Sequence, residues 1–178
     1  MMNLFLTLLD SEEEKSKFEK VYEKYRKLMH YVAKGILTDD QLAEDAVQEA
    51  FFRIAKNFYK VGEIDCPQTK NFVVIIVRNA ALTIAKKEET ASSIEDIDSL
   101  SDGEVRQDDS TFEKVEISEL IGEILNLPET YRYPLYLYGV YDYKMAEIAN
   151  LLGITTETAK KRVQRGRQIL RNNLEKGV

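Results

Sequence analysis

Apolar and polar positions follow helical spacing along most of this 178-residue chain. The first such stretch is expected to begin at Ser11, whose hydroxyl can form a capping box with Glu14, and to reach about Ile36. Its apolar side chains recur every three or four residues, so they would share one face of a helix. They are Phe18, Val21, Tyr22, Tyr25, Leu28, Met29 and Val32.

Two further helices are expected before residue 88. A second capping box, Thr38 with Gln41, would open a helix that runs through about Phe58. After a loop, Pro67 suits the first turn of a third long helix. Residues 73–77 are all β-branched, so a buried strand is an alternative for that run.

A change of composition separates this part of the chain from the rest. From Glu88 to about Thr111 acidic residues and serines dominate, which is typical of a linker. Helical spacing resumes at Phe112, and Pro128 opens another helix that is expected to end near Gly139. Tyrosines crowd this stretch and are expected to pack in the core and at its rim, with a base-stacking platform as the alternative. They are Tyr131, Tyr133, Tyr136, Tyr138, Tyr141 and Tyr143.

The last part of the chain has the pattern of a helix-turn-helix. The first of its helices carries apolar side chains on one face, at Met145, Ile148, Ala149 and Leu152. Gly153 can adopt the turn conformation that a side chain would resist, and Thr155 suits the N-cap of the next helix. The apolar stripe of that second helix consists of Ala159, Val163, Ile169 or Leu170, and Leu174.

The other face of the second helix is basic. From Thr158 to the end, seven lysines and arginines stand against one acid, Glu175. A helix of this kind fits the major groove of DNA, with its first turns nearest the bases. The alternative is a solvated helix end, because cations also favour helix C-termini. We expect Lys160, Lys161, Gln164 and Arg165 to face bases, and Arg162, Arg167 and Arg171 to meet phosphates.

The net charge of the whole chain does not by itself indicate DNA binding. The chain has a formal net charge of −6 and a pI near 5.0. Acidic residues are concentrated between residues 88 and 119, whereas the segments before and after are neutral to basic. The average over the chain therefore hides a basic C-terminal end.

Few residues carry chemistry suited to catalysis or metal binding. Cys66 is the only cysteine, so no internal disulfide can form, and we expect it to be partly buried. His30 is the only histidine, and it is expected to pack within an apolar helix. The stretch Met1–Leu9 is short and lacks the basic lead of a signal peptide, and no stretch is long enough to span a membrane. These features favour a cytoplasmic protein without a metal site.

Two runs of this sequence resemble parts of a known family. The run LNLPETYRYPLYLYGVYDYKMAEIANLLGITTETAKKRVQRGRQILRNNL resembles region 4 of bacterial RNA polymerase sigma factors, and FEKVYEKYRKLMHYVAKGILTDDQLAEDAVQEAFFRIAKNF resembles region 2. Their order and the chain length match the extracytoplasmic-function group. The resemblance implies an all-α fold with two small helical domains: a region 2 bundle over residues 1–87, an acidic linker over 88–111, and a region 4 helix-turn-helix over 112–178.

The resemblance also implies three sets of binding residues. The polymerase-binding set is Asp45, Gln48, Glu49, Phe52 and Arg53, and the set for the minus-10 element is Arg78, Asn79, Lys86 and Lys87. The set for the minus-35 element is Thr156, Thr158, Lys160, Lys161, Arg162, Gln164, Arg165 and Arg167. The loop from Lys60 to Thr69 corresponds to one that takes up an extruded base. Considered as side chains alone, Asp45 and Glu49 could instead form a metal or acid/base site.

Some positions differ from the residues that are usual in this family. Phe72 stands where many members carry tryptophan, and Thr83 replaces a common aspartate. Lys144 lies near a usual serine cap, and Ala159 replaces a usual valine. These differences leave the minus-10 preference and the strength of promoter melting open.

The function implied is that of a promoter-specificity subunit with no catalysis of its own. Its partners would be core RNA polymerase, through the β′ clamp helices and the β flap, promoter DNA, and an anti-sigma factor. It would need no cofactor, metal or small-molecule substrate. The residues alone also allow a helix-turn-helix regulator with an N-terminal ligand-sensing or dimerisation bundle, and, as a third possibility, an enzyme.

Overall fold

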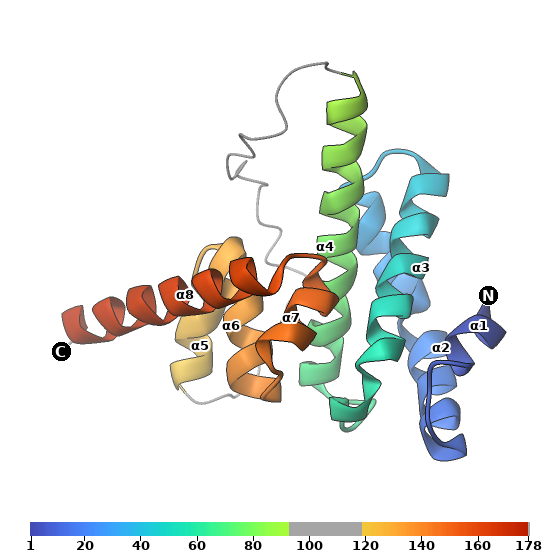
Figure 1. The fold of residues 1–178 in the computed structure, drawn as a ribbon, viewed down its shortest axis with the longest axis horizontal. Helices are drawn as coiled ribbons and strands as arrows, with labels where there is room; N and C mark the ends of the chain where they lie inside the picture. Colours follow the sequence, from blue (N-terminus) through green and yellow to red (C-terminus); the bar gives the residue numbers. More distant parts are fainter. Residues whose placement is uncertain (93–118, 178) are drawn as a thin grey trace. The chain divides into compact units, whose positions relative to one another are not determined.

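The computed structural model describes residues 1–92 and 119–177. Within these residues the secondary structure consists of α-helices and one short 3₁₀ helix, which confirms the predicted all-α fold (Figure 1). The chain divides into two compact units, Met1–Glu113 and Lys114–Val178. The division falls in the segment outside the described residues, and so does the larger part of the expected linker, residues 93–111.

The first unit is a bundle of three long helices with a short helix at its N-terminus. Helices α2 (Glu12–Lys34), α3 (Asp40–Lys56) and α4 (Pro67–Ser92) each pack against the other two, and α1 (Met2–Leu6) packs on α2 and α3. The 3₁₀ helix η1 (Phe58–Lys60) leads into the loop before α4. The core between the long helices is filled by aliphatic and aromatic side chains, so burial of apolar surface is the main stabilising contribution.

The predicted start of α2 is confirmed. The Ser11 hydroxyl accepts the N–H of Glu14 at 3.1 Å, as an N-cap should. The Glu14 carboxylate accepts the N–H of Asp10, also at 3.1 Å, so the reciprocal bond reaches one residue further back than in a standard capping box. The helix ends at Lys34, with Gly35 as its C-cap, slightly before the expected Ile36.

The predicted capping box of α3 is wrong. The N-cap is Asp39, whose carboxylate accepts the N–H of Leu42 at 2.9 Å. The carbonyl of Thr38 instead accepts the ammonium of Lys34 at 2.7 Å. The Gln41 amide donates to Asp45 at 3.4 Å, further along the helix. Thr38 and Asp39 are both of residue types that can cap a helix, and in the structure the second of them does so.

Helix α4 settles the alternative between helix and strand for residues 73–77. The whole run is helical, and each of its five side chains is at most 1% exposed. These residues lie between α2 and α3, so burial on several sides explains the continuous apolar run. The helix continues to Ser92, five residues into the segment expected to be linker. The hydroxyl of Thr90 donates to the carbonyl of Lys86 at 3.1 Å in this last part.

The short helix α1 belongs to the aromatic core of the first unit. Phe5 is 2% exposed, and its ring centroid lies 5.9 Å from that of Phe18, 6.3 Å from Tyr22 and 6.2 Å from Phe51. Leu9 is also buried. The apolar N-terminal stretch therefore anchors itself on α2 and α3 through packing, a role that its composition alone did not indicate.

The second unit contains α5 (Glu119–Leu125), α6 (Glu129–Tyr141), α7 (Met145–Leu152) and α8 (Thr156–Lys176). Helix α6 is central, because it packs against each of the other three. A Cβ placed on Gly166 of α8 would lie 3.3 Å from the Cβ of Tyr131 on α6. A glycine at this position thus permits the close approach of α6 and α8. Helix α6 ends at Tyr141, two residues after the expected Gly139.

The helix-turn-helix prediction is confirmed. Gly153 has a φ of 65° and forms the left-handed C-cap of α7. The hydroxyl of Thr155 accepts the N–H of Thr158 at 3.1 Å and caps α8. Ala159, Val163 and Leu170 are buried, as the apolar stripe predicted, whereas Leu174 is 41% exposed.

Candidate polymerase and nucleic-acid interfaces

Helix α8 carries a basic face opposite its buried stripe. The predicted minus-35 residues lie along this face. Six of them are exposed, namely Thr156, Lys160, Lys161, Gln164, Arg165 and Arg167, and two are half-buried, namely Thr158 and Arg162. Arg171 is exposed as well. The helical rise of about 1.5 Å per residue spreads these side chains over several turns, a length that matches a groove contact.

Three of these residues have contacts within the second unit. Arg167 lies over the ring of Tyr138 on α6, 5.8 Å from its centroid, so its guanidinium is supported by the adjacent helix. The Thr158 hydroxyl accepts a bond of 2.8 Å from the Thr155 hydroxyl and takes part in the N-cap. Lys161 lies 3.9 Å from Glu157 across exposed surface, an interaction that contributes little.

Arg165 has a partner that the sequence did not indicate. Its Nη1 donates to Oε1 of Gln168 at 3.1 Å, and both residues are exposed. A glutamine three residues further along the helix can orient the guanidinium while leaving its other N–H groups open. Gln168 was not among the predicted site residues, although its spacing of three residues from Arg165 could have indicated this contact.

Helix α3 carries the predicted polymerase-binding residues. Asp45 and Glu49 are exposed, and Gln48 and Phe52 are half-buried. The ammonium of Lys56 lies 4.4 Å from the centroid of the Phe52 ring. A polar strip beside a partly exposed aromatic ring suits contact with a protein partner.

Arg53 is placed differently from the other residues of the predicted polymerase-binding set. Only 8% of this residue is exposed. Its Nε donates to Oε1 of Glu49 at 2.8 Å, one helical turn back. The aliphatic part of an arginine can be buried readily, and whether a neighbouring helix covers it depends on packing that helical spacing does not reveal.

Both α3 carboxylates of the acid/base alternative have side-chain partners in the structure. Asp45 receives a bond from the Gln41 amide, and Glu49 is paired with Arg53. Among residues 1–92 and 119–177 no group of three or more His, Cys, Asp or Glu side chains could hold a metal ion. His30 is half-buried, with Nε2 3.5 Å from the Asp40 carboxylate, at the junction of α2 and α3.

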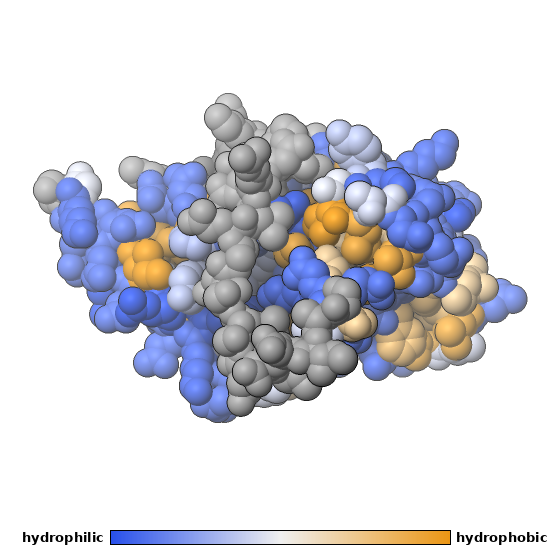
Figure 2. Space-filling model, turned by 90° about the horizontal axis from the view of Figure 1, so that it is seen from above, coloured by the Kyte–Doolittle hydropathy of each residue, from blue (hydrophilic) through white to orange (hydrophobic). Residues whose placement is uncertain are grey.

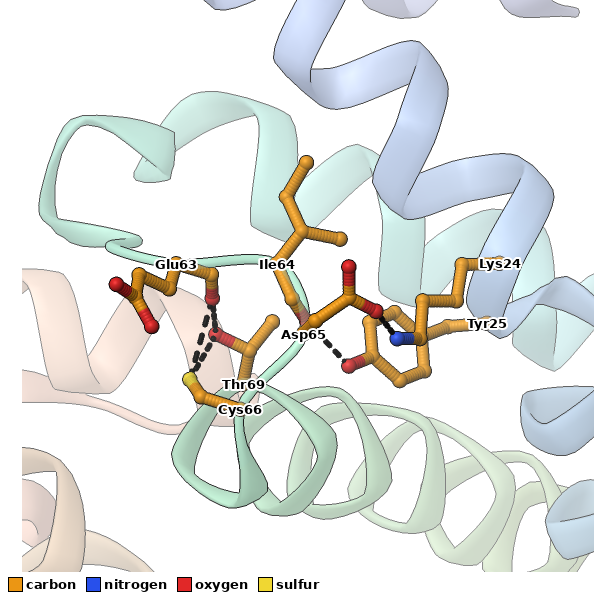
Figure 3. A network of polar contacts seen from close by, with 7 residues as sticks. All are labelled: Lys24, Tyr25, Glu63, Ile64, Asp65, Cys66 and Thr69. Atoms are coloured by element: carbon orange, nitrogen blue, oxygen red, sulfur yellow. Dashed lines mark hydrogen bonds and ion pairs between the residues drawn. The ribbon is translucent and has the colours of Figure 1, made fainter.

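The loop between η1 and α4 is tied to α2 (Figure 3). The Tyr25 hydroxyl donates to the carbonyl of Ile64 at 2.5 Å, and Lys24 forms an ion pair with Asp65. Lys17 donates to the carbonyl of Val61. Three α2 side chains thus hold a loop that lies about forty residues away in sequence, and no local signal could have identified them as partners.

Residues at and just before the start of α4 also hold this loop. The Thr69 hydroxyl donates to the carbonyl of Glu63, and the Cys66 thiol donates to the same carbonyl at 3.2 Å. Cys66 is half-buried, in agreement with its predicted partial burial. An open hollow of about 430 Å³ adjoins the loop, lined by Glu13, Ser16, Lys17, Lys20, Gly62, Glu63 and Ile64.

The predicted minus-10 residues lie along α4. Arg78 and Asn79 are half-buried, whereas Lys86 and Lys87 are exposed. Asn79, Thr83 and Lys86 follow one another at steps of four and three, so they share one face of the helix. The Thr83 hydroxyl donates to the Asn79 carbonyl at 2.9 Å and is thereby turned along the helix.

The described surface that Figure 2 shows is mostly hydrophilic. Hydrophilic residues make up most of the coloured part of that face, with separate hydrophobic patches between them. The large apolar side chains exposed in the described residues are Met1, Leu4, Tyr31, Tyr59, Leu120 and Leu174. None of the described helices has both the length and the hydropathy that crossing a bilayer requires.

Comparison with known proteins assigns the two units to one family. Residues 21–90 match the model of Sigma-70 region 2, and residues 117–170 match that of Sigma-70, region 4. The chain is 28% identical over 163 residues to the ECF RNA polymerase sigma factor SigM of Bacillus subtilis, covering 90% of this chain and 96% of that protein. It is 26% identical over 151 residues to RNA polymerase sigma factor SigZ of the same organism, covering 85% and 82%.

A solved structure also matches. The sigma factor RpoE from Bartonella quintana, in complex with the anti-sigma factor NepR, is 18% identical and covers 89% of this chain and 97% of its own, with a TM-score of 0.37. The two family matches, in the order region 2 then region 4, together span more than half of the chain. The protein belongs to the sigma-70 family of RNA polymerase sigma factors, in its extracytoplasmic-function group.

Proposed function

We propose that α3 docks this sigma factor on core RNA polymerase while α4 and α8 recognise the minus-10 and minus-35 elements of a promoter. The observation that carries this proposal is the presence of both sigma regions in one chain, in the order that the family uses. The protein would act as a specificity subunit without catalysis of its own, in the cytoplasm where polymerase and DNA meet.

The exposed strip of α3 supports the polymerase contact. Asp45 and Glu49 offer carboxylates, and Phe52 offers part of an aromatic ring beside them. Charged and aromatic groups on one face favour a specific protein partner over a small ligand. The β′ clamp helices are the partner that we assign to this face, and region 4 would meet the β flap.

The basic face of α8 supports the minus-35 contact. Lys160, Gln164 and Arg165 are exposed on the first turns, where a recognition helix approaches base edges. Arg167, supported by Tyr138, and the exposed Arg171 lie further along and suit phosphates. Such a contact depends strongly on salt, because phosphate binding releases counterions.

The loop before α4 and the face of α4 support the minus-10 contact. The loop is held by side chains of both α2 and α4, so a base could enter a preformed site. Extruding a base costs a few kcal/mol of stacking and pairing, and a rigid pocket returns more of that energy than a mobile one. Arg78, Asn79 and Lys86 would hold the strand along α4, and Lys87 would meet a phosphate.

Reconstitution with core polymerase tests the proposal. Run-off transcription over a promoter library should give transcripts only when this protein is added, from templates that share two elements. A helix-turn-helix regulator would instead bind duplex DNA tightly, as a dimer and without polymerase. Tight binding by the free protein, together with no transcript from any template, would refute the assignment.

An anti-sigma factor is a further expectation from the family, and co-purification from a native host would test it.

A further inference from the structure

The ion pair between Glu49 and Arg53 is unequal in exposure. The Glu49 side chain is 46% exposed, whereas the Arg53 side chain is 9% exposed. A single bond of 2.8 Å joins Nε of Arg53 to Oε1 of Glu49. An ordinary surface pair holds both side chains loosely, but here the donor is fixed by the core and the acceptor reaches the surface.

We propose that Arg53 is a positioning residue for polymerase binding, which acts by holding the Glu49 carboxylate in one orientation. This inference rests on the proposed function of α3. Oε1 is bound to Arg53 and the side chain is 46% exposed, so the second carboxylate oxygen would be the one that meets a partner. A glutamate that is already ordered loses less conformational freedom on binding, so its contact contributes more to affinity.

Burial leaves Arg53 itself little surface for a direct contact. Its Nη1 is fully enclosed and has no hydrogen-bond partner in the structure. A partner could reach this atom only by displacing the residues that cover it. This nitrogen therefore does not contact polymerase directly, and the effect that we assign to Arg53 acts through Glu49.

The fold alone gives little reason for an arginine at this position. A buried guanidinium with an unpaired N–H costs stability, and a well-packed apolar side chain is often as good or better. Asp45 and Glu49 also lie one turn apart on the same face, where like charges repel. Arg53 offsets that repulsion and keeps both carboxylates available.

A double-mutant cycle on the full chain tests the inference. The variants are Arg53→Met, Glu49→Ala and the two together, and the measured quantity is the Kd for core polymerase. We expect Arg53→Met to weaken binding by about fivefold to tenfold, in the range of coupled contact pairs. In the Glu49→Ala background the same change should have no further effect. Arg53→Lys should recover part of the loss, because it keeps a donor and the charge.

Arg26→Met is the matched control. Arg26 pairs with Glu44 of α3 at 3.5 Å, and both lie outside the proposed polymerase residues. This variant also removes the arginine partner of an α3 glutamate, but that glutamate is not a proposed polymerase contact. The variant should therefore leave the Kd unchanged. Melting temperatures measured on all variants separate loss of fold from loss of positioning, since a purely structural role would lower stability without coupling to Glu49. If Arg53→Met does not fold, Arg53→Lys carries the same cycle.

Three results would overturn the inference. Arg53→Met could leave the Kd unchanged, it could weaken binding equally with and without Glu49, or Glu49→Ala could bind as tightly as wild type. Failure of the proposed function is distinguishable from all three, because the wild-type protein itself would then not bind core polymerase.

Discussion

The tie between α2 and the loop before α4 makes one prediction that can be worked out in detail. Tyr25→Phe removes a hydroxyl that donates to the Ile64 carbonyl at 2.5 Å, and it leaves the buried ring in place. The proposed role of the loop is to receive an extruded minus-10 base. We therefore expect this variant to bind polymerase normally and to be impaired in opening the promoter.

The size of the effect follows from the exposure of the acceptor. A neutral hydrogen bond contributes about 1 kcal/mol, and an orphaned buried carbonyl would add to the cost of its loss. Ile64 is only half-buried, so water can reach its carbonyl and the lower figure applies. A change of about 1 kcal/mol is roughly a fivefold change in the population of the ordered loop. The rate of open-complex formation should fall by about the same factor.

A fluorescent base analogue in the non-template strand of the minus-10 element would report base extrusion. Tyr31→Phe is the control, because Tyr31 lies on the same helix and is 70% exposed. It should behave as wild type. Equal open-complex rates for Tyr25→Phe and wild type, or an equal loss with Tyr31→Phe, would refute the assigned role of the loop.

Three further predictions concern the recognition helix and the core. Arg165→Ala should weaken DNA binding by about 1–3 kcal/mol and relax specificity at one minus-35 position, whereas Arg171→Ala should weaken binding to all sequences alike. A binding-site selection on holoenzyme would show this difference, and identical profiles for the two variants would contradict the separate roles. Gly166→Val should destabilise the second unit by about 2 kcal/mol in urea unfolding, because α6 leaves no room for the side chain. Phe5→Ala should lower the free energy of unfolding by about 3 kcal/mol, the lower end of the range for a buried phenylalanine, because α1 is short. A loss below about 1 kcal/mol would show that α1 is not part of the core.

The features that could be predicted from sequence are those encoded by neighbouring residues. Gly153 and Thr155 specify the turn and the start of α8 within a few positions, so the helix-turn-helix could be predicted correctly. The cap of α3 was not predicted correctly, because Thr38 and Asp39 are both competent N-cap residues and neither side chain by itself shows which of them caps the helix. Local chemistry leaves such a choice open until tertiary contacts decide it.

The features that could not be predicted depend on how helices cross. Helical spacing placed Arg53 beside Glu49, but only packing in the bundle shows that one is buried and the other exposed. The tie from Tyr25 to Ile64 joins residues 39 positions apart, and nothing near either residue indicates the other. The first feature lies in the proposed polymerase surface and the second in the proposed minus-10 loop, and in each a buried side chain holds a less buried residue.

The charge distribution explains why two separate units suit this function. The basic face of α8 belongs to a chain whose net charge is −6, so the free protein is repelled by DNA at long range. In the proposed function, docking α3 on polymerase would place α8 near the promoter and would raise its effective concentration there without any new DNA contact. Each DNA contact can then remain weak by itself. Promoter recognition would depend on polymerase because neither helix binds tightly without it, and a positioned Glu49 would strengthen the contact on which both depend.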